Sequence, residues 1–253
     1  MRRSTVLLVL GAFAVVGAFA CGGGDSGSAG GGDTPAVTAA PLGNGSIAGV
    51  VNFTGTAAAN PAIDMAEETA CAEKWADGPT DPIVSVQDGK LANAFVRVTG
   101  GLPAGPYPMP GAAAAVDQNG CLYSPRVVGV MVGQDLAITN SDQVLHNIKA
   151  VPTENRGFNI SQPRAGMTTT RSFNTPEVMV PLECNVHGWM NAYVGVVEHP
   201  YFAVSGADGS FTISGLPAGT YQLEAWHETL GVQTGEVTVA ADGAATVEFT
   251  FSS

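Results

Sequence analysis

Apolar and polar residues alternate in short runs along most of the chain, from residue 46 to its end. A period of two is typical of β-strands that bury one face. Turn-forming residues separate the runs, and only a short helix is expected, near 65–75. The pattern therefore predicts an all-β protein with enough strands for Greek-key sandwiches. The candidate strands are 46–53, 91–98, 112–118, 127–131, 135–140, 146–151, 157–160, 168–173, 177–184, 191–198, 201–205, 210–214, 220–226, 236–239 and 246–251.

Residues 1–45 do not share this alternation. Arg2 and Arg3 precede an apolar run that ends at Ala20, which is typical of a secretory signal peptide in residues 1–20. The run is shorter than the roughly 20 apolar residues that a membrane span requires. Residues 21–45 are rich in glycine, serine, alanine and threonine, so we expect them to form a flexible tether.

The residues before Cys21, Ala18-Phe19-Ala20, resemble a bacterial lipoprotein processing site. The resemblance implies that Cys21 becomes a lipidated N-terminus. The protein would then be exported and anchored in a membrane, on its periplasmic face or at the cell surface. The motif lacks the leucine that usually stands three positions before the cysteine. In the alternative, ordinary cleavage nearby leaves a soluble periplasmic protein.

The chain carries a formal net charge of −12. Loss of Arg2 and Arg3 with the signal peptide leaves 8 basic and 22 acidic residues, a charge of −14. This excess of acid argues against nucleic acid as a partner, because phosphates are bound by clustered basic side chains. An acidic surface favours a basic redox partner, and it is equally consistent with a merely solvated surface.

The segment Cys184-Asn185-Val186-His187-Gly188-Trp189-Met190 places a thiolate, an imidazole and a thioether close together in the chain. Upstream, His146 opens a strand candidate. A cysteine and two histidines with a long axial methionine form a blue-copper site. We therefore predict a copper site of His146, Cys184, His187 and Met190. In the alternative, Cys184 is a buried thiol, and His187 and Met190 are loop residues with no role in metal binding. Zinc is disfavoured because methionine is a poor zinc ligand.

His146-Asn147 on a strand, followed by Cys-x2-His-x2-Met on a later loop, resembles the cupredoxins. The loop is most similar to those of amicyanin and pseudoazurin, and the resemblance covers roughly residues 112–198. It implies a blue-copper protein that transfers electrons, with Asn147 tying the two ligand loops together by hydrogen bonds. It also implies that His187 is the electron port, with Trp189 in an apolar surface patch. In the alternative, Trp189 turns inward beneath the loop.

A second resemblance starts at residue 208, in Asp-Gly-Ser-Phe-x-Ile-x-Gly-Leu-Pro-Ala-Gly-Thr-Tyr-x-Leu. This sequence looks like the carboxypeptidase regulatory-like domain, a transthyretin-like sandwich whose early strands would be 45–50 and 91–98. We therefore expect residues 46–100 and 199–253 to form one sandwich, with a cupredoxin domain, 101–198, inserted between them. In the rival arrangement two domains follow in series, and 46–111 joins the cupredoxin sheet.

The cysteines divide into three uses. Cys21 is assigned to lipid and Cys184 to copper, which leaves Cys71 and Cys121 as an even pair in an exported protein. A disulfide between them is expected in an oxidising compartment, and two separate buried thiols are the alternative. A haem is disfavoured because the sequence contains no Cys-x-x-Cys-His.

The function expected from these features is one-electron transfer to a redox protein, without enzymatic activity. A multicopper enzyme needs a further centre with several histidines, and only His199 and His227 remain for one. A second alternative is a surface protein that binds copper, a polysaccharide or another protein, with no role in electron transfer. Trp226 or Tyr221 would then stack on sugar, although aromatic residues in such strands are more often part of the core.

Overall fold

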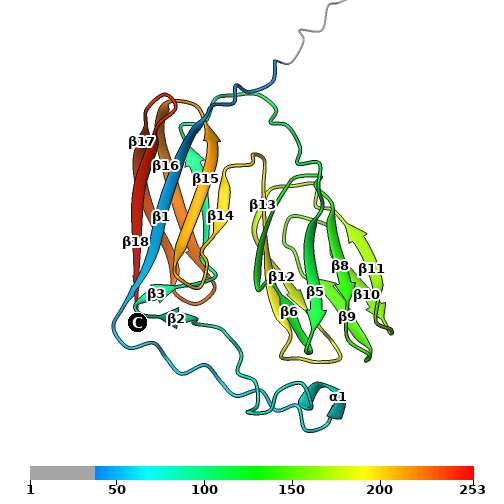
Figure 1. Ribbon diagram of the computed structural model, residues 1–253. Coiled ribbons are helices and arrows are strands. Elements are labelled where there is room, and N and C mark those ends of the chain that lie inside the picture. Colours follow the sequence, from blue (N-terminus) through cyan, green and yellow to red (C-terminus); the bar gives the residue numbers. More distant parts are fainter. Residues whose placement is uncertain (1–37) are drawn as a thin grey trace, which may run out of the picture. The chain divides into compact units, whose positions relative to one another are not determined.

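The computed structural model describes residues 38–253 (Figure 1). The predicted signal peptide, most of the predicted tether and the predicted lipidation site, Cys21, lie outside these residues. The described chain is almost entirely β-structure, and the predicted all-β fold class is confirmed. Within residues 38–253, no helix is long and apolar enough to cross a membrane.

The elements follow the predicted order along the chain. The alternation did not reveal β2 and β6, because two or three residues are too few to show a period. The elements are β1 (Gly45–Thr54), α1 (Thr69–Ala72), β2 (Val86–Gln87), β3 (Lys90–Leu91), β4 (Phe95–Gly100), β5 (Ala114–Asn119), β6 (Leu122–Ser124), β7 (Val127–Met131), β8 (Leu136–Asn140), β9 (His146–Ala150), β10 (Phe158–Gln162), β11 (Met167–Arg171), β12 (Glu177–Glu183), β13 (Asn191–Val197), β14 (Phe202–Val204), β15 (Ser210–Leu216), β16 (Gly219–His227), β17 (Gly231–Val239) and β18 (Ala244–Ser252).

One sandwich combines strands from both ends of the described chain (Figure 1). Its first sheet has the order β15-β1-β3-β2, with β18 also paired to β1, and its second sheet has the order β14-β4-β16-β17. β1 runs antiparallel to β15 and parallel to β18, while β4 pairs with β14 and β16. The chain thus leaves this sandwich after β4 and returns to it at β14.

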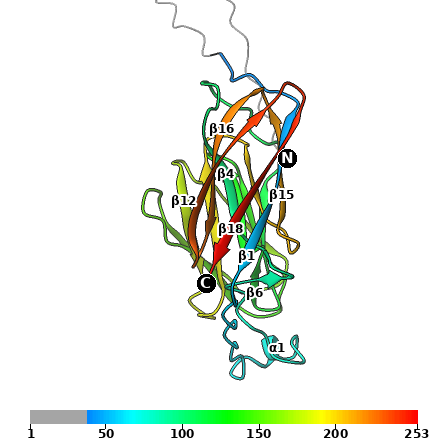
Figure 2. The same cartoon turned by 90° about the vertical axis from the view of Figure 1, so that its left-hand side faces the viewer.

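The strands from β5 to β13 form a second sandwich (Figure 1), whereas Figure 2 shows β1 and β18 of the first sandwich side by side. One sheet has the order β10-β9-β12-β13-β7 and the other β11-β8-β5-β6. Alternate residues of β8 point inward, as the period of two requires, so Leu136 and Ile138 are fully buried. They pack with Ile148, Leu182 and Val194 in one apolar core.

Residues 62–80, which we call the strap, differ from the sequence prediction. The domain boundaries placed them in the first sandwich, whereas Met65 and Cys71 pack in the core of the second. Cys71 forms a disulfide with Cys121, with a Cα–Cα distance of 5.6 Å. The ends of the strap meet in an isolated β-bridge between Ala62 and Thr80. A segment without apolar periodicity is therefore held by a covalent link that the alternation could not show.

The two sandwiches pack together at two glycines, Gly129 and Gly195, where a larger residue would not fit. Phe95 of β4 lies against β13 and β7, and its ring centroid is 5.7 Å from that of Phe202. A Cβ atom on Gly195 would lie 2.6 Å from the Phe95 ring, and one on Gly129 would lie 2.3 Å from the Phe202 ring. Only glycine lets the sheets approach this closely.

A buried ion cluster joins the same parts of the chain. Arg126, which precedes β7, donates to Glu228 over 2.8 Å and also pairs with Asp81. His227, the last residue of β16, is 1% exposed, and its Nε2 has no hydrogen-bond partner among the described residues. Burial, and then the charge of Arg126, lower the pKa of His227 to about 4. The imidazole is therefore neutral in the folded protein near pH 7.

This imidazole should make the stability of the protein depend on pH. Between pH 6.5 and about 4 the unfolded chain binds a proton at His227 that the folded protein does not, so the free energy of unfolding should fall as the pH drops through this window. The loss attributable to His227 should reach about 3 kcal/mol. Denaturant unfolding of the metal-free wild type and His227→Leu measures it. A difference between the two proteins that stays constant with pH would contradict the prediction.

Candidate metal centre

The loop between β12 and β13 carries Cys184, His187 and Met190. It is folded by two backbone hydrogen bonds, in which the Met190 N–H donates to the His187 carbonyl over 3.0 Å and the Cys184 N–H donates to the Met190 carbonyl over 3.3 Å. His146 comes from the first position of β9, in the same sheet as β12. The predicted ligands are thus carried by neighbouring strands and the loop that follows one of them.

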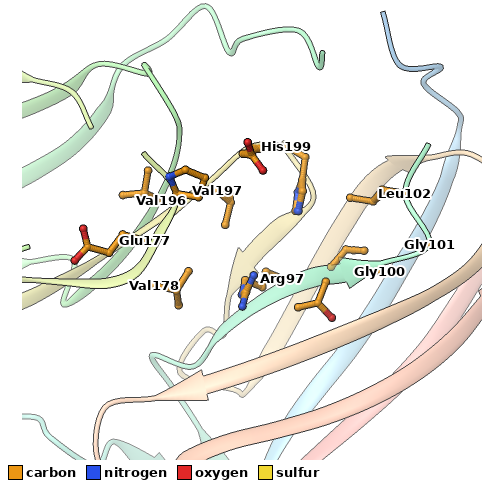
Figure 3. A pocket seen from close by; sticks show the side chains of 13 residues that line it. Arg97, Gly100, Gly101, Leu102, Glu177, Val178, Val196, Val197 and His199 are labelled. Atoms are coloured by element: carbon orange, nitrogen blue, oxygen red, sulfur yellow. The ribbon is translucent and has the colours of Figure 1, made fainter. Parts of the chain in front are cut away.

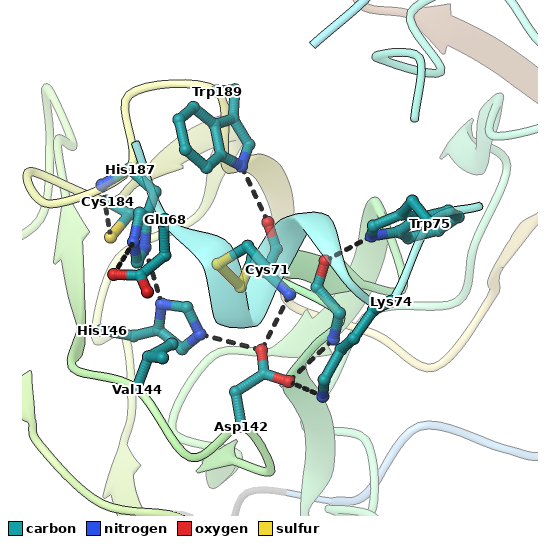
Figure 4. Close-up of a disulfide and its surroundings, with 12 residues drawn as sticks. Glu68, Cys71, Lys74, Trp75, Asp142, Val144, His146, Cys184, His187 and Trp189 are labelled. Carbon is teal, nitrogen blue, oxygen red and sulfur yellow. Dashed lines mark hydrogen bonds and ion pairs between the residues drawn. A yellow bond between two sulfur atoms is a disulfide. The ribbon is translucent and has the colours of Figure 1, made fainter. Parts of the chain in front are cut away.

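Three of the four predicted ligands converge in the structure (Figure 4). One ring nitrogen of His146, one of His187 and the Cys184 sulfur lie within 4.8 Å of one another. The Nδ1 atoms of His146 and His187 are 2.9 Å apart. The backbone N–H of His187 donates to the Cys184 sulfur over 3.3 Å. Met190 is fully buried in the same core as Cys184. The donor set of two imidazoles and a thiolate, with the Met190 thioether buried in the same core, fits copper.

The surroundings of Cys184 favour its thiolate form. Burial alone would raise the pKa of the thiol, but hydrogen bonds from His146 and from the Asn147 and His187 amides lower it. Burial also acts against a charge on His146, yet its bonds to Asp142 and Cys184 leave the pKa of that imidazole raised. For His187, burial and then the charge of His146 lower the pKa. The lowered pKa values of Cys184 and His187 favour the thiolate and the neutral imidazole, the forms that bind a metal ion, whereas the raised pKa of His146 favours its imidazolium when no metal is bound.

Asn147 connects the two segments that carry the ligands. Its Oδ1 accepts a hydrogen bond from the Asn185 N–H, and its Nδ2 donates to Asn159 on β10. The residue after one histidine ligand thereby holds the start of the ligand loop. This is the role that the resemblance implied for it, and such outer contacts keep ligands oriented.

Asp142 was not recognised from the sequence. It is 1% exposed, and its Oδ2 accepts from His146 Nε2 over 2.8 Å and from the Cys121 N–H over 2.8 Å. Its Oδ1 accepts from the Gly120 N–H over 2.9 Å and pairs with Lys74 of the strap. With the Nε2 proton held by the carboxylate, His146 keeps Nδ1 as the lone-pair donor that a metal needs. The only sequence signal was an aspartate four positions before the histidine.

His187 and Trp189, the predicted electron port, lie next to the strap and the core. His187 is only 3% exposed, and the Glu68 carboxylate of the strap lies 3.9 Å from its Nε2. Trp189 packs against the core, and its Nε1 donates to the Cys121 carbonyl over 2.9 Å. Its ring centroid lies 5.1 Å from that of His187. The inward packing of Trp189 matches the alternative stated for it, and the disulfide holds the strap at this edge.

The two other histidines lie outside this cluster. His199 lines a hollow of about 490 Å³ with Arg97 and Glu177 (Figure 3). The groups there are engaged, since Arg97 donates to Glu224 over 2.9 Å and Glu177 accepts from the amides of residues 153–155. Among the described residues, the other group with metal-ligand spacing includes Cys121, whose sulfur is in the disulfide.

The comparisons with known proteins concern separate parts of the chain. Residues 190–252 match the family model of the carboxypeptidase regulatory-like domain. The match takes in β13 to β18, of which β14 to β18 lie in the first sandwich, and β1 to β4 complete that sandwich. No protein of curated function matches the chain.

The solved structures that the chain resembles include cupredoxins. A purple cupredoxin from Nitrosopumilus maritimus is 23% identical with a TM-score of 0.29, over 33% of this chain and 98% of that one. A methionine-to-alanine variant of amicyanin in its Cu(I) form is 20% identical with a TM-score of 0.30, over 33% and 81%. A copper-containing nitrite reductase from Thermus scotoductus is 18% identical with a TM-score of 0.31, over 40% and 25%. With identities below 25% and TM-scores near 0.3, these likenesses carry no argument about the function of this chain.

Replacing Asp142 tests whether this carboxylate holds the site together. Asp142→Asn should lower the free energy of unfolding at pH 7 by about 2–3 kcal/mol, because an amide cannot accept all of the hydrogen bonds that the carboxylate accepts. Burial alone would raise the pKa of Asp142, but its hydrogen bonds to His146 and Lys74 lower it below 3.8 in the folded protein. The carboxylate therefore stabilises the fold above pH 3.8, and this stabilisation is lost as the pH falls below that value. Urea unfolding of the metal-free proteins measures both effects.

The matched control is Asp135→Asn, which changes an exposed carboxylate nearby in sequence. We expect it to leave the free energy of unfolding nearly unchanged. Equal effects of the two substitutions would show that Asp142 has no special role.

Proposed function

We propose that this protein is a single-electron carrier that binds one copper ion through His146, Cys184, His187 and Met190. The observation that carries the proposal is the buried convergence of two imidazole nitrogens and a thiolate sulfur within 4.8 Å. These donors, with a thioether buried in the same core, suit copper better than zinc, calcium or magnesium.

Copper, when bound, supplies a couple that gains or loses one electron. The work of the chain is to hold its donors still, because ligands that need not move cost little reorganisation when the charge changes. Asp142 fixes the His146 ring and Asn147 fixes the start of the ligand loop. The His187 N–H donates to the Cys184 sulfur and stabilises negative charge there. Four protein donors would leave no open position for a substrate on a bound copper ion, which supports a carrier over an enzyme.

The partner and the location belong to the same proposal. The net charge of −12 favours a basic redox protein as the partner. The sequence around Cys21 supports lipid anchoring of an exported protein, with residues 21–45 as the tether that spaces the folded part from its membrane. The first strands of the carboxypeptidase regulatory-like sandwich, β1 to β4, would then lie between the anchor and the electron-transfer site along the chain, and its other strands follow that site.

The colour of the copper-loaded protein tests the function. We expect the full-length wild type to show an intense visible absorption, because charge transfer from a thiolate sulfur to copper absorbs strongly, and to be reduced and reoxidised reversibly by one electron. Cys184→Ser should lose this absorption and keep the circular dichroism of the folded protein. Val186→Ser, an exposed position on the same loop, is the matched control and should keep the colour. A colourless wild type that binds copper would contradict the proposal.

A further inference from the structure

Trp75 of the strap lies at the edge of a surface hollow of about 670 Å³, which we call the Trp75 hollow. Other residues that line it include Lys74, Asn93, Leu122, Tyr123 and Arg126. Trp75 is 36% exposed and its indole packs flat on Gly120, where an added Cβ atom would lie 3.2 Å from the ring. Two aromatic side chains of this hollow also reach toward the predicted copper ligands.

Tyr123 connects the hollow with the segment that carries His146. The ring lines the hollow, yet the residue is only 5% exposed and packs in the same core as Cys184. Its hydroxyl donates to the Asn147 carbonyl over 2.6 Å. One side chain therefore connects the hollow with the backbone of Asn147, the residue that follows the predicted ligand His146.

Trp75 connects the hollow with the other ligands. Its Nε1 donates to the Gly120 carbonyl over 2.8 Å, and Trp189 Nε1 donates to the next carbonyl, that of Cys121, over 2.9 Å. The Trp189 ring in turn lies 5.1 Å from the His187 ring, centroid to centroid. Figure 4 shows the two indoles with the disulfide between them. The two indoles thus bind the carbonyls of adjacent residues, and one indole lies beside a predicted ligand while the other is at the surface.

The opposite edge of the site is less accessible. His187 is 3% exposed, and the Glu68 carboxylate lies 3.9 Å from its outer nitrogen. A redox partner that approached there would meet the strap before it met the imidazole. The exposed apolar side chains Leu145 and Val186 remain near that edge, and they mark the competing exit.

We propose that electrons leave and enter the site through the Trp75 hollow, where a basic redox partner contacts Trp75, and that His187 is not the exit. The inference rests on the function proposed above. One electron moves from the reduced centre to the oxidised partner, so the centre is oxidised and the partner reduced by one electron, and no bond or proton changes. The strap that carries Trp75 also carries exposed acidic residues, which favour a cationic partner. These residues are Asp64, Glu67, Glu73 and Asp77.

The kinetic test uses tris(phenanthroline)cobalt(III), a cationic aromatic oxidant, with reduced copper-loaded full-length protein. Trp75→Leu should lower the second-order rate constant by about tenfold, within the range of association-rate changes among variants of one interface. Trp75→Phe should lower it less, because an aromatic ring remains. Val186→Ser should leave the rate unchanged, and so should Val232→Ser, an exposed position on β17. The visible spectrum should stay the same in all variants.

A second measurement needs neither copper nor a variant. The redox-inert chromium(III) complex of the same ligand is paramagnetic and broadens NMR signals of the groups that it contacts. Added to the metal-free wild type, it should broaden the indole N–H signal of Trp75. Broadening at the Leu145 and Val186 methyl groups instead, with Trp75 unaffected, would overturn the exit.

The outcomes separate the two proposals. Suppose that the copper-loaded protein is blue, that Trp75→Leu has the wild-type rate constant and that Val186→Ser has a lower one. This result would overturn the Trp75 exit and leave the electron-carrier function intact. A copper-loaded wild type with no intense colour and no reversible one-electron couple would overturn the function itself. Slower transfer in Trp75→Leu with an unchanged spectrum, together with broadening at Trp75, supports both.

Discussion

The buried carboxylate of Asp142 is the interaction on which the site depends most. A charged group that is 1% exposed is costly unless every lone pair finds a partner, and here an imidazole, two backbone amides and an ammonium group supply them. Those partners belong to β9, to the turn between β5 and β6, and to the strap. Satisfying one charge therefore fixes the relative positions of a metal ligand, the disulfide turn and the segment that covers the site.

The rest of the architecture supplies rigidity around this contact. The second sandwich buries Cys184 and Met190 in the same core as its strand residues, so the ligand loop is packed from beneath. The first sandwich reaches it through the contacts of Phe95 with Gly129 and Gly195, where no larger residue fits. A ligand set held from several sides is suited to a reaction in which charge changes and geometry should not.

Local features of the site were predictable from the sequence. Cys184, His187 and Met190 stand close together in the chain, and the period of two showed most strands, because each of these signals lies within one element. The pairing of Cys71 with Cys121 followed from the cysteine count, and the structure contains that bond. Contacts between distant segments were not predictable. Nothing near Asp142 indicates the Gly120 and Cys121 amides, and Glu68 meets His187 only because the disulfide holds the strap there.

The pairing of β1 with β18 has a mechanical consequence. Ser46–Thr54 lies parallel to Ala244–Ser252 along the whole of both strands, and β1 is the first strand of the described chain. A pull on the chain ahead of Gly45 therefore loads this ladder in shear, so that many hydrogen bonds resist together instead of opening one by one. The strands that carry the predicted copper ligands lie in a loop of the chain that leaves after β4 and returns at β14, outside the line of that force. A protein held by its N-terminal end in flowing or crowded surroundings would transmit tension through one sandwich and leave the geometry of the other undisturbed.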